Sequence, residues 1–180
     1  YLDCLKDRSP AAMNAVAQDV RKRMALLPIA ECLRPDGKFL ERIEQDIDHS
    51  LRLRSWIHPN NDTEGDTFEE RTIFNDLASV HTASLLVAAN YLLGQRLRPE
   101  TRAGIRREVR RRTLDPFRQR IDSGKDIYWW VTVTHNWNSV CLLHTVACAL
   151  ALEEDPRDRA WYVAVAQDLA HQHRLGDVVV

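Results

Sequence analysis

The segment from Trp137 to Leu152 constrains the fold of this chain more than any other part of the sequence. Its residues are apolar on nearly every side of a helical wheel rather than along one stripe. A helix of this kind is stable only where other helices surround it. The sequence therefore predicts an inner helix here, within a core that is built from packed helices.

Five further segments place apolar residues at the three- and four-residue spacing of an amphipathic helix. Ser9 and Pro10 open the first segment, and Pro28 is expected to close it. The remaining segments are expected to run from Phe39 to about Trp56, from a capping box of Thr67 and Glu70 to Gly94, from Pro99 to a break or kink at Pro116, and from Pro156 to about Gly176.

No segment longer than Ile127 to Val133 alternates apolar and polar residues as a strand does. The sequence therefore predicts a single all-α domain over residues 1–180, in which consecutive helices form antiparallel pairs. Pairs of roughly thirty to forty residues close into a toroid or stack into a solenoid. The pattern leaves both architectures open.

The composition argues against two classes of partner. The chain has 25 Lys and Arg against 26 Asp and Glu, a net charge of -1, so no overall field attracts nucleic acid or an anionic membrane. No run approaches the roughly 18 apolar residues of a membrane span, and no charged-then-apolar leader opens the chain. We therefore expect neither nucleic acid nor a membrane as a partner.

No metal or cofactor is expected from the sequence. The cysteines are too scattered for a disulfide framework and are interpreted as small buried hydrophobes: Cys4, Cys32, Cys141 and Cys148. His144 has no second histidine at the right offset on its helix, which favours a core histidine over a zinc ligand. The Asn60–Glu70 loop is faintly similar to a calcium loop, but Arg71 stands where the bidentate glutamate belongs.

The candidate functional site is the stretch YWWVTVTHNWNSVC, residues 128–141, which holds three of the five tryptophans at a predicted loop-to-helix boundary. Aromatic faces stack on sugar rings, and neighbouring amides supply hydrogen bonds. The candidate sugar contacts are Tyr128, Trp130, Trp137 and Asn138. Asn136 and His135, at the mouth of the helix, are suited to a carboxylate because the helix amino end favours anions.

The alternative interpretation of this stretch is structural. In that case the tryptophans pack the entrance of the helix, and Asn136 or Asn138 caps it. The arginine run from Arg106 to Arg112 has two interpretations as well. It binds a sulfated or carboxylated polymer, or it forms the solvated outer face of a helix, and the second is favoured.

The residues NWNSVC at positions 136–141 resemble a motif of the heparinase II/III-like polysaccharide lyases and their alginate-lyase relatives. The stretch Leu97–Arg102 is similar to the usual helix start of that family, and the resemblance extends over about residues 39–175. It implies an (α/α) toroid followed by a β-sandwich region. It also implies cleavage of an acidic, uronate-containing polysaccharide by β-elimination, without a cofactor, in the periplasm or outside the cell.

The resemblance assigns roles to individual residues. Asn136 matches the asparagine that neutralises the uronate carboxylate, and His135 beside it is expected to assist. Trp137 occupies the position of a histidine in the alginate-lyase branch. The tyrosine acid and base would lie beyond Val180. The chain is therefore expected to be an incomplete toroid from a longer protein, inactive by itself.

Two other functions remain open at this stage. One is a non-catalytic helical module that binds glycans or a protein. The other is a toroid glycoside hydrolase, which requires two carboxylates that face each other across a cleft. Asp115, Asp122 and Asp126 lie near the motif in sequence, but nothing in the sequence pairs them.

Overall fold

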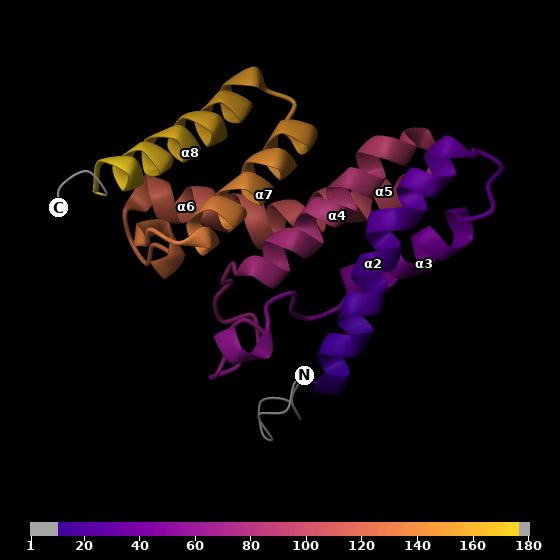
Figure 1. The fold of residues 1–180 in the computed structure, drawn as a ribbon, viewed down its shortest axis with the longest axis horizontal. Helices are drawn as coiled ribbons and strands as arrows, with labels where there is room; N and C mark the ends of the chain where they lie inside the picture. The colour runs from indigo at the N-terminus through magenta and orange to yellow at the C-terminus, as the bar shows by residue number, and fades with distance from the viewer. Residues whose placement is uncertain (1–10, 177–180) are drawn as a thin grey trace.

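The computed structural model describes the backbone of residues 11–176 and the side chains of residues 16–170. All regular structure in that part is helical, which confirms the all-α prediction (Figure 1). The α-helices are α2 (Ala11–Leu33), α3 (Leu40–Arg52), α4 (Leu77–Leu93), α5 (Pro99–Val109), α6 (Asp115–Ser123), α7 (Asn136–Leu152) and α8 (Pro156–Gly176). The short helices are η1 (Pro59–Asn61), η2 (Gly94–Arg96), the π-helix η3 (Arg110–Leu114) and η4 (Trp129–Thr132).

Successive helices pack in pairs, and the pairs pack side by side. α2 contacts α3, α4 contacts α5, and α7 contacts α8. The first helices of the pairs form one layer, because α2 packs against α4 and α4 packs against α7. The second helices continue on the other side, where α3 contacts α5. Figure 1 shows α4 at the centre of this arrangement.

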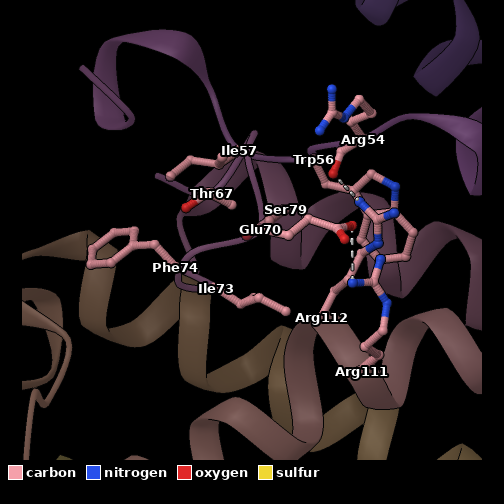
Figure 2. A pocket seen from close by; sticks show the side chains of 10 residues that line it. All are labelled: Arg54, Trp56, Ile57, Thr67, Glu70, Ile73, Phe74, Ser79, Arg111 and Arg112. Carbon is pink, nitrogen blue, oxygen red and sulfur yellow. Dashed lines mark hydrogen bonds and ion pairs between the residues drawn. The ribbon is translucent and has the colours of Figure 1, made fainter. Parts of the chain in front are cut away.

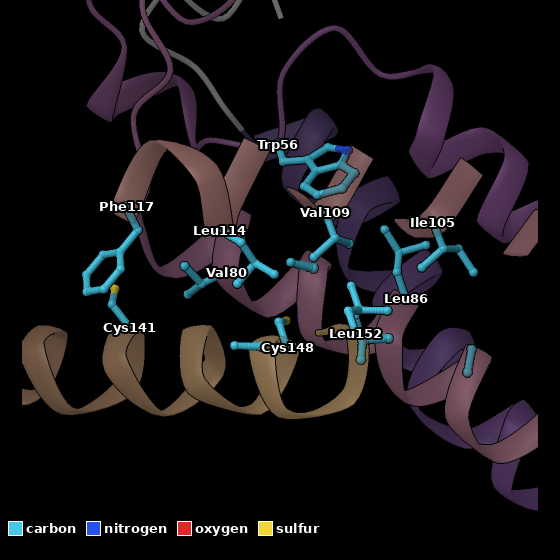
Figure 3. Packing of buried hydrophobic residues seen from close by; sticks show 14 of the residues in the cluster. Trp56, Val80, Leu86, Ile105, Val109, Leu114, Phe117, Cys141, Cys148 and Leu152 are labelled. Atoms are coloured by element: carbon cyan, nitrogen blue, oxygen red, sulfur yellow. The ribbon is translucent and has the colours of Figure 1, made fainter. Parts of the chain in front are cut away.

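The core lies between the α4–α7 pair and the helix that runs through α5, η3 and α6. Figure 3 shows Cys141 and Cys148 of α7 facing Val80 of α4, with Leu114 of η3 close by, and all four side chains are buried. The predicted inner helix is thus confirmed on this side. On its opposite side, however, α7 exposes Leu143 to 66% and Leu150 to 47%.

The segment Leu77–Arg96, which contains α4, is long and apolar enough by composition to cross a membrane. This differs from the expectation that no segment approaches such a span. Its place in the fold accounts for the composition, because α4 packs against α2, α5 and α7. A central core helix meets the same criterion as a membrane helix.

Pro28 does not close the first helix, as the sequence had suggested. α2 continues through it to Leu33. The turn after α2 is fixed by Glu31, a carboxylate with 0% exposure that accepts hydrogen bonds from the backbone N–H groups of Gly37 and Phe39. Arg96 also donates to this carboxylate. These contacts stabilise the last helical turn and offset the backbone hydrogen bond lost at the proline.

The predicted capping box at Thr67 and Glu70 is wrong. The helix begins ten residues later at Leu77, where the Asp76 carboxylate accepts from Ser79 N at 2.8 Å and Ser79 Oγ accepts from Asp76 N at 2.9 Å. The backbone N–H of Thr67 instead donates to Asp62, a buried carboxylate that orders the loop. The short serine at the third helical position completes a reciprocal cap in place of the usual Glu or Gln.

Two other predicted boundaries also shift. α3 ends at Arg52 rather than near Trp56, whose indole N–H donates back to Ser50 O at 2.8 Å. Pro116 does not break the helix. The chain passes from α5 through η3 into α6, and Asp115 N–H donates to Arg110 O five residues earlier, as in a π-turn.

Candidate functional site

The aromatic stretch divides into a buried side and an exposed side. Tyr128 and Trp130 are 1% and 0% exposed, and their rings stack on each other with centroids 5.4 Å apart. The Trp130 indole donates to Asn75 O at 2.7 Å, and Phe117 stacks on its ring. This burial contradicts the expectation that these two rings stack on sugars, because neither presents a face to solvent. For Trp130 the packing agrees with the structural alternative; for Tyr128 no structural role was predicted.

The environment of Tyr128 also removes it as an acid or base near neutral pH. Burial raises the pKa of the Tyr128 phenol to about 12, although the Arg120 guanidinium over its ring favours the ionised form. Its hydroxyl donates to Ile73 O at 3.3 Å. Tyr128 therefore anchors the segment before α4 rather than taking part in proton transfer.

Asn138 is likewise a structural residue. It is 5% exposed, and its side-chain amide donates to Trp130 O at 3.3 Å and to Val131 O at 3.0 Å. These bonds fasten η4 to the first turn of α7. Asn138 also lines the groove between α7 and α8, and the expectation that it contacts substrate stays a prediction.

The exposed side of the stretch gathers three rings. Trp129, which is 44% exposed, lies 4.8 Å from the ring centroid of the half-buried Trp137 and 5.7 Å from that of His135. Trp129 was not selected from the sequence. Trp129 and Trp130 occupy successive positions of the turn η4, so their side chains point to different sides. Adjacent tryptophans in a short turn therefore indicate that one of them faces solvent.

His135 and Asn136 form the amino end of α7. The imidazole Nδ1 of His135 accepts from Trp137 N at 3.2 Å, so His135 is the cap, and neither Asn136 nor Asn138 fills that role. This hydrogen bond assigns the neutral tautomer with its proton on Nε2. The exposed Asn136 side chain makes no hydrogen bond with another described residue. The two side chains thus offer N–H donors to solvent at the positive end of the helix.

An open groove of about 580 Å³ runs from this site between α7 and α8. His135 lies at its polar end, and its walls are mainly apolar: Leu142, Leu143, Val146, Val163, Ala166 and Ala170. A groove of this volume lies in the range of small-molecule sites. It places an apolar surface next to the donors of His135 and Asn136.

The arginine run forms a solvated face only in part, because Arg106 and Arg107 are exposed whereas Arg112 is buried. Figure 2 shows Arg111 and Arg112 reaching Glu70 and the backbone of Arg54. Arg112 is 7% exposed, and its guanidinium lies 4.9 Å from the ring centroid of Trp56. The cavity between these residues has a volume of about 10 Å³, room for one water molecule. It is not a ligand site.

The remaining arginines of the run join neighbouring elements. Arg106 donates to Leu152 O at 2.6 Å, and Arg110 donates to both oxygens of Glu153 at 2.8 and 2.6 Å. Desolvation acts to raise the pKa of Glu108, but hydrogen bonds from neighbouring arginines hold this pKa below its usual range. Carboxylates and carbonyls of the protein therefore bind these arginines, and the exposed Arg106 and Arg107 agree with the outer face that the sequence favoured.

The cysteines and the candidate metal ligands separate into different environments. Cys141 and Cys148 are buried as expected, whereas Cys32 is exposed, and Cys4 lies outside the described residues. No group of three or more His, Cys, Asp or Glu side chains among the described residues is arranged to hold a metal. His144 is not the core histidine that was expected, because it is half-buried and exposed toward one side.

The carboxylates that a hydrolase would need are engaged elsewhere. Asp115 pairs with Arg110 at 3.2 Å, and Asp122 lies 3.6 Å from Arg118. Asp126 is an exposed residue of the turn before η4, with a φ of 49°. Asp115 and Asp126 line one open cleft of about 620 Å³ together with Glu70, whereas Asp122 is not among its lining residues.

The chain matches no protein-family model and no curated protein. The resemblance to polysaccharide lyases therefore depends on the residues of the NWNSVC stretch and on their placement in the fold.

Proposed function

We propose that this chain is part of a polysaccharide lyase of the heparinase II/III-like kind, which cleaves a uronate-containing polysaccharide by β-elimination. The observation that supports this best is the solvent-facing pair of donors, Asn136 and His135, at the amino end of the partly buried helix α7. The proposal includes an (α/α) toroid, of which the α2–α4–α7 layer is a part, and a location in the periplasm or outside the cell.

The chemistry of β-elimination requires such donors. A base removes the C5 proton of the uronate, the electron pair forms a C4–C5 double bond, and the C4–oxygen bond breaks while an acid protonates the departing oxygen. The negative charge of the adjacent carboxylate opposes loss of the C5 proton. The Asn136 amide and the His135 Nε2–H are donors that neutralise this charge, assisted by the positive helix end.

The geometry of His135 favours a donor role over a role as base. Its Nδ1 lone pair already accepts the Trp137 N–H, which leaves a proton rather than a lone pair on the solvent-facing Nε2. Tyr162 cannot serve as the base either, because it is buried and burial raises its pKa. Neither His135 nor Tyr162 is therefore assigned as the base of the proposed reaction.

The aromatic contacts of the proposed site differ from those that the sequence suggested. Trp129 and Trp137 lie side by side next to His135, and Trp129 presents an exposed ring. We assign sugar stacking to this pair, because indole faces pack on the apolar faces of sugar rings. The carboxylate of the stacked sugar then lies toward Asn136.

The test uses the full-length protein that carries this chain and a panel of uronate polymers. Cleavage by β-elimination creates a conjugated double bond, which is followed by ultraviolet absorbance. Asn136→Ala is expected to lower kcat by about 100-fold or more, because it removes charge stabilisation from the transition state. Asn60→Ala, at an exposed loop position, serves as the control. Unchanged turnover in Asn136→Ala, or products without the double bond, would contradict the proposal.

A non-catalytic glycan-binding module is the second candidate. The apolar groove between α7 and α8 favours it, because a groove of this kind supports binding without any catalytic group. In that case the full-length protein binds acidic glycans but releases no unsaturated product. The same absorbance measurement, combined with a binding titration, separates the two functions.

A further inference from the structure

Three basic side chains stand on the neighbouring helices of the α2–α4–α7 layer, and two of them are in ring contact. His81 of α4 and His144 of α7 lie with their ring centroids 5.5 Å apart and their planes 31° apart. Arg21 of α2 is close enough that its positive charge acts on the His81 imidazole. None of these three side chains belongs to the site proposed around Asn136.

The Arg21 guanidinium has no hydrogen-bonded or ion-pair partner among the described residues. The Arg21 side chain is half-buried. Asp76 acts on it electrostatically, but the oxygens of that carboxylate accept hydrogen bonds from the protein. Those donors are His58 N, Asn61 Nδ2 and Ser79 N. Desolvation of an unpaired guanidinium is unfavourable, and an anion bound beside it would offset that cost.

We propose that Arg21, His81 and His144 bind a carboxylate or sulfate group of the acidic polysaccharide, at a second site beside that of Asn136. This inference depends on the proposed function for the identity of its ligand. Arg21 supplies a permanent charge with several N–H donors, and each imidazole supplies one N–H. The three side chains together supply the donors and the charge that such a group requires.

The position of the second site relative to the first fits a polymer. Asn136 and His144 are eight residues apart on α7, which corresponds to about 12 Å along the helix axis. Asn136, Leu143 and Leu150 follow one exposed stripe at seven-residue spacing, and His144 lies at its edge, where it meets His81 of α4. An oligosaccharide with repeated acidic groups would place one at each site.

Protonation of the two histidines would add positive charge to this site. Desolvation lowers the pKa of both imidazoles, and for His81 the charges of His144 and Arg21 lower it further. Asp76, at the start of α4, acts on Arg21. Both histidines are therefore largely neutral at pH 7 and gain charge as the pH falls. Affinity for an anion should rise on acidification, and a bound anion should in turn raise both pKa values.

The first experiment measures histidine pKa values by NMR in the full-length protein, in sodium sulfate and in sodium chloride of equal ionic strength. Sulfate is expected to raise the pKa of His81 and His144 by at least about half a unit. Arg21→Gln is expected to abolish the rise, whereas Lys22→Gln removes the same charge from an exposed neighbour and should preserve it. A rise of equal size in Arg21→Gln, which would be an effect of salt alone, overturns the inference.

The second experiment uses a uronate oligosaccharide and a neutral oligosaccharide of the same length, with affinities measured by calorimetry. Arg21→Gln and the double variant His81→Gln/His144→Gln are each expected to weaken binding of the acidic ligand about tenfold, with no effect on the neutral one. Undiminished binding of the acidic ligand overturns the inference. So does a response to sulfate without a response to the oligosaccharide, which would assign the site to a small free anion.

The two proposals fail in distinguishable ways. If the protein releases an unsaturated product and the Arg21 and histidine variants bind the oligosaccharide normally, the second site is wrong and the lyase function stands. If Arg21-dependent binding of the acidic ligand occurs but no unsaturated product forms from any uronate polymer, the lyase function is wrong. A KM that rises more than kcat falls in Arg21→Gln supports both proposals, because it locates the loss in binding.

Discussion

Two asparagines in the motif NWN have opposite environments. The Asn136 side chain faces solvent, whereas Asn138 is buried and holds the carbonyls of η4. Residues two apart on a helix point to nearly opposite sides, so the spacing predicts that the two asparagines differ. The sequence did not predict which of them is buried, because that depends on Phe117 and Asn75, which pack against η4 from distant parts of the chain.

Alanine substitution should separate the two asparagines. Asn138→Ala leaves the carbonyls of Trp130 and Val131 without their donor and is expected to lower the free energy of unfolding by about 1–3 kcal/mol. Asn136→Ala should change it by less than about 0.5 kcal/mol. Urea denaturation measures both. Equal losses in the two variants would show that Asn136 has a structural role that its exposure does not indicate.

The three described cysteines should differ in reactivity. Burial raises the pKa of the Cys141 and Cys148 thiols to about 12, so both remain protonated and enclosed at pH 8. Cys32 is exposed, and its thiol is accessible to reagent. Native-state labelling with iodoacetamide, read by peptide mass spectrometry, is expected to modify Cys32 and to leave the other two unmodified until the protein unfolds. Labelling of Cys141 or Cys148 at the rate of Cys32 would contradict their burial.

Glu31 should make stability depend on acidity. Desolvation acts to raise the pKa of its carboxyl, but hydrogen bonds from Phe39, Gly37 and Arg96 outweigh this effect and hold the pKa below its usual range. A lowered folded-state pKa contributes stability above the unfolded pKa of about 4.3, and that contribution is lost as the pH falls through the folded value. The destabilisation by Glu31→Gln should therefore be larger at pH 7 than at pH 3.5.

Urea unfolding of the Glu31 variant at the two pH values tests this expectation. Glu41→Gln, at an exposed position of α3, is the matched control and should show little effect at either pH. If the Glu31→Gln difference is independent of pH, the carboxylate is not ionised against these donors in the folded protein.

At the level of elements, the long segment between α3 and α4 is held by arginines from the helix that spans α5, η3 and α6. Arg112 donates to Arg54 O at 2.9 Å, Arg111 donates to Glu70 at 3.2 Å, and Arg120 donates to Ile73 O at 3.0 Å. The segment has no regular structure besides η1 among its described residues. Tertiary contacts rather than local propensity therefore order it.

Arg112→Ala should loosen this segment. The substitution removes the stack on Trp56, the hydrogen bond to Arg54 O and one hydrogen bond to Glu108. It is expected to lower the free energy of unfolding by about 2–4 kcal/mol. Arg107→Ala removes an exposed partner of the Glu108 carboxylate and should lower the free energy of unfolding by less than about 1 kcal/mol. Hydrogen exchange read by mass spectrometry should show faster exchange over residues 54–73 in the first variant only. Equal exchange in both would locate the support of the segment elsewhere.

For the molecule as a whole, several large apolar side chains of α2, α4 and α7 are exposed: Leu26, Ile29, Leu33, Tyr91, Leu92, Leu143 and Leu150. Where such side chains form a contiguous surface, they mark an interaction surface or cause self-association. The helix predicted from Trp137 to Leu152 is thus covered on only part of its circumference within the described structure.

A charge introduced among these side chains should reduce the exposed apolar surface without unfolding the chain. Leu143→Glu/Leu150→Glu is expected to lower the fluorescence of the bound hydrophobic dye ANS by about half or more and to leave the circular dichroism of the helices unchanged. Ile127→Glu, in the loop before η4, is the control for added charge. Dye fluorescence that does not change in the double variant would place the main apolar surface elsewhere.

Periodicity predicted the helical class and the approximate location of the described α-helices except α6, which lies beyond the break or kink expected at Pro116. The boundaries were less predictable. The end of α2 depends on Arg96 bonding to Glu31, and the start of α4 depends on Asp62 drawing the backbone of Thr67 into the loop. In the candidate site, the positions of Asn136 and His135 follow from the helix start, whereas the inward packing of Trp130 depends on distant residues.

The π-turn η3 affects how this chain aligns with homologous sequences. It contains one residue more than an α-turn would, as the bond from Asp115 N to Arg110 O indicates. The helix absorbs this extra residue locally, so the packing faces of Ile105 before it and Phe117 after it keep their register. A homologue with an uninterrupted α-helix should therefore align with a one-residue gap between positions 110 and 114, and its flanking core positions should still match.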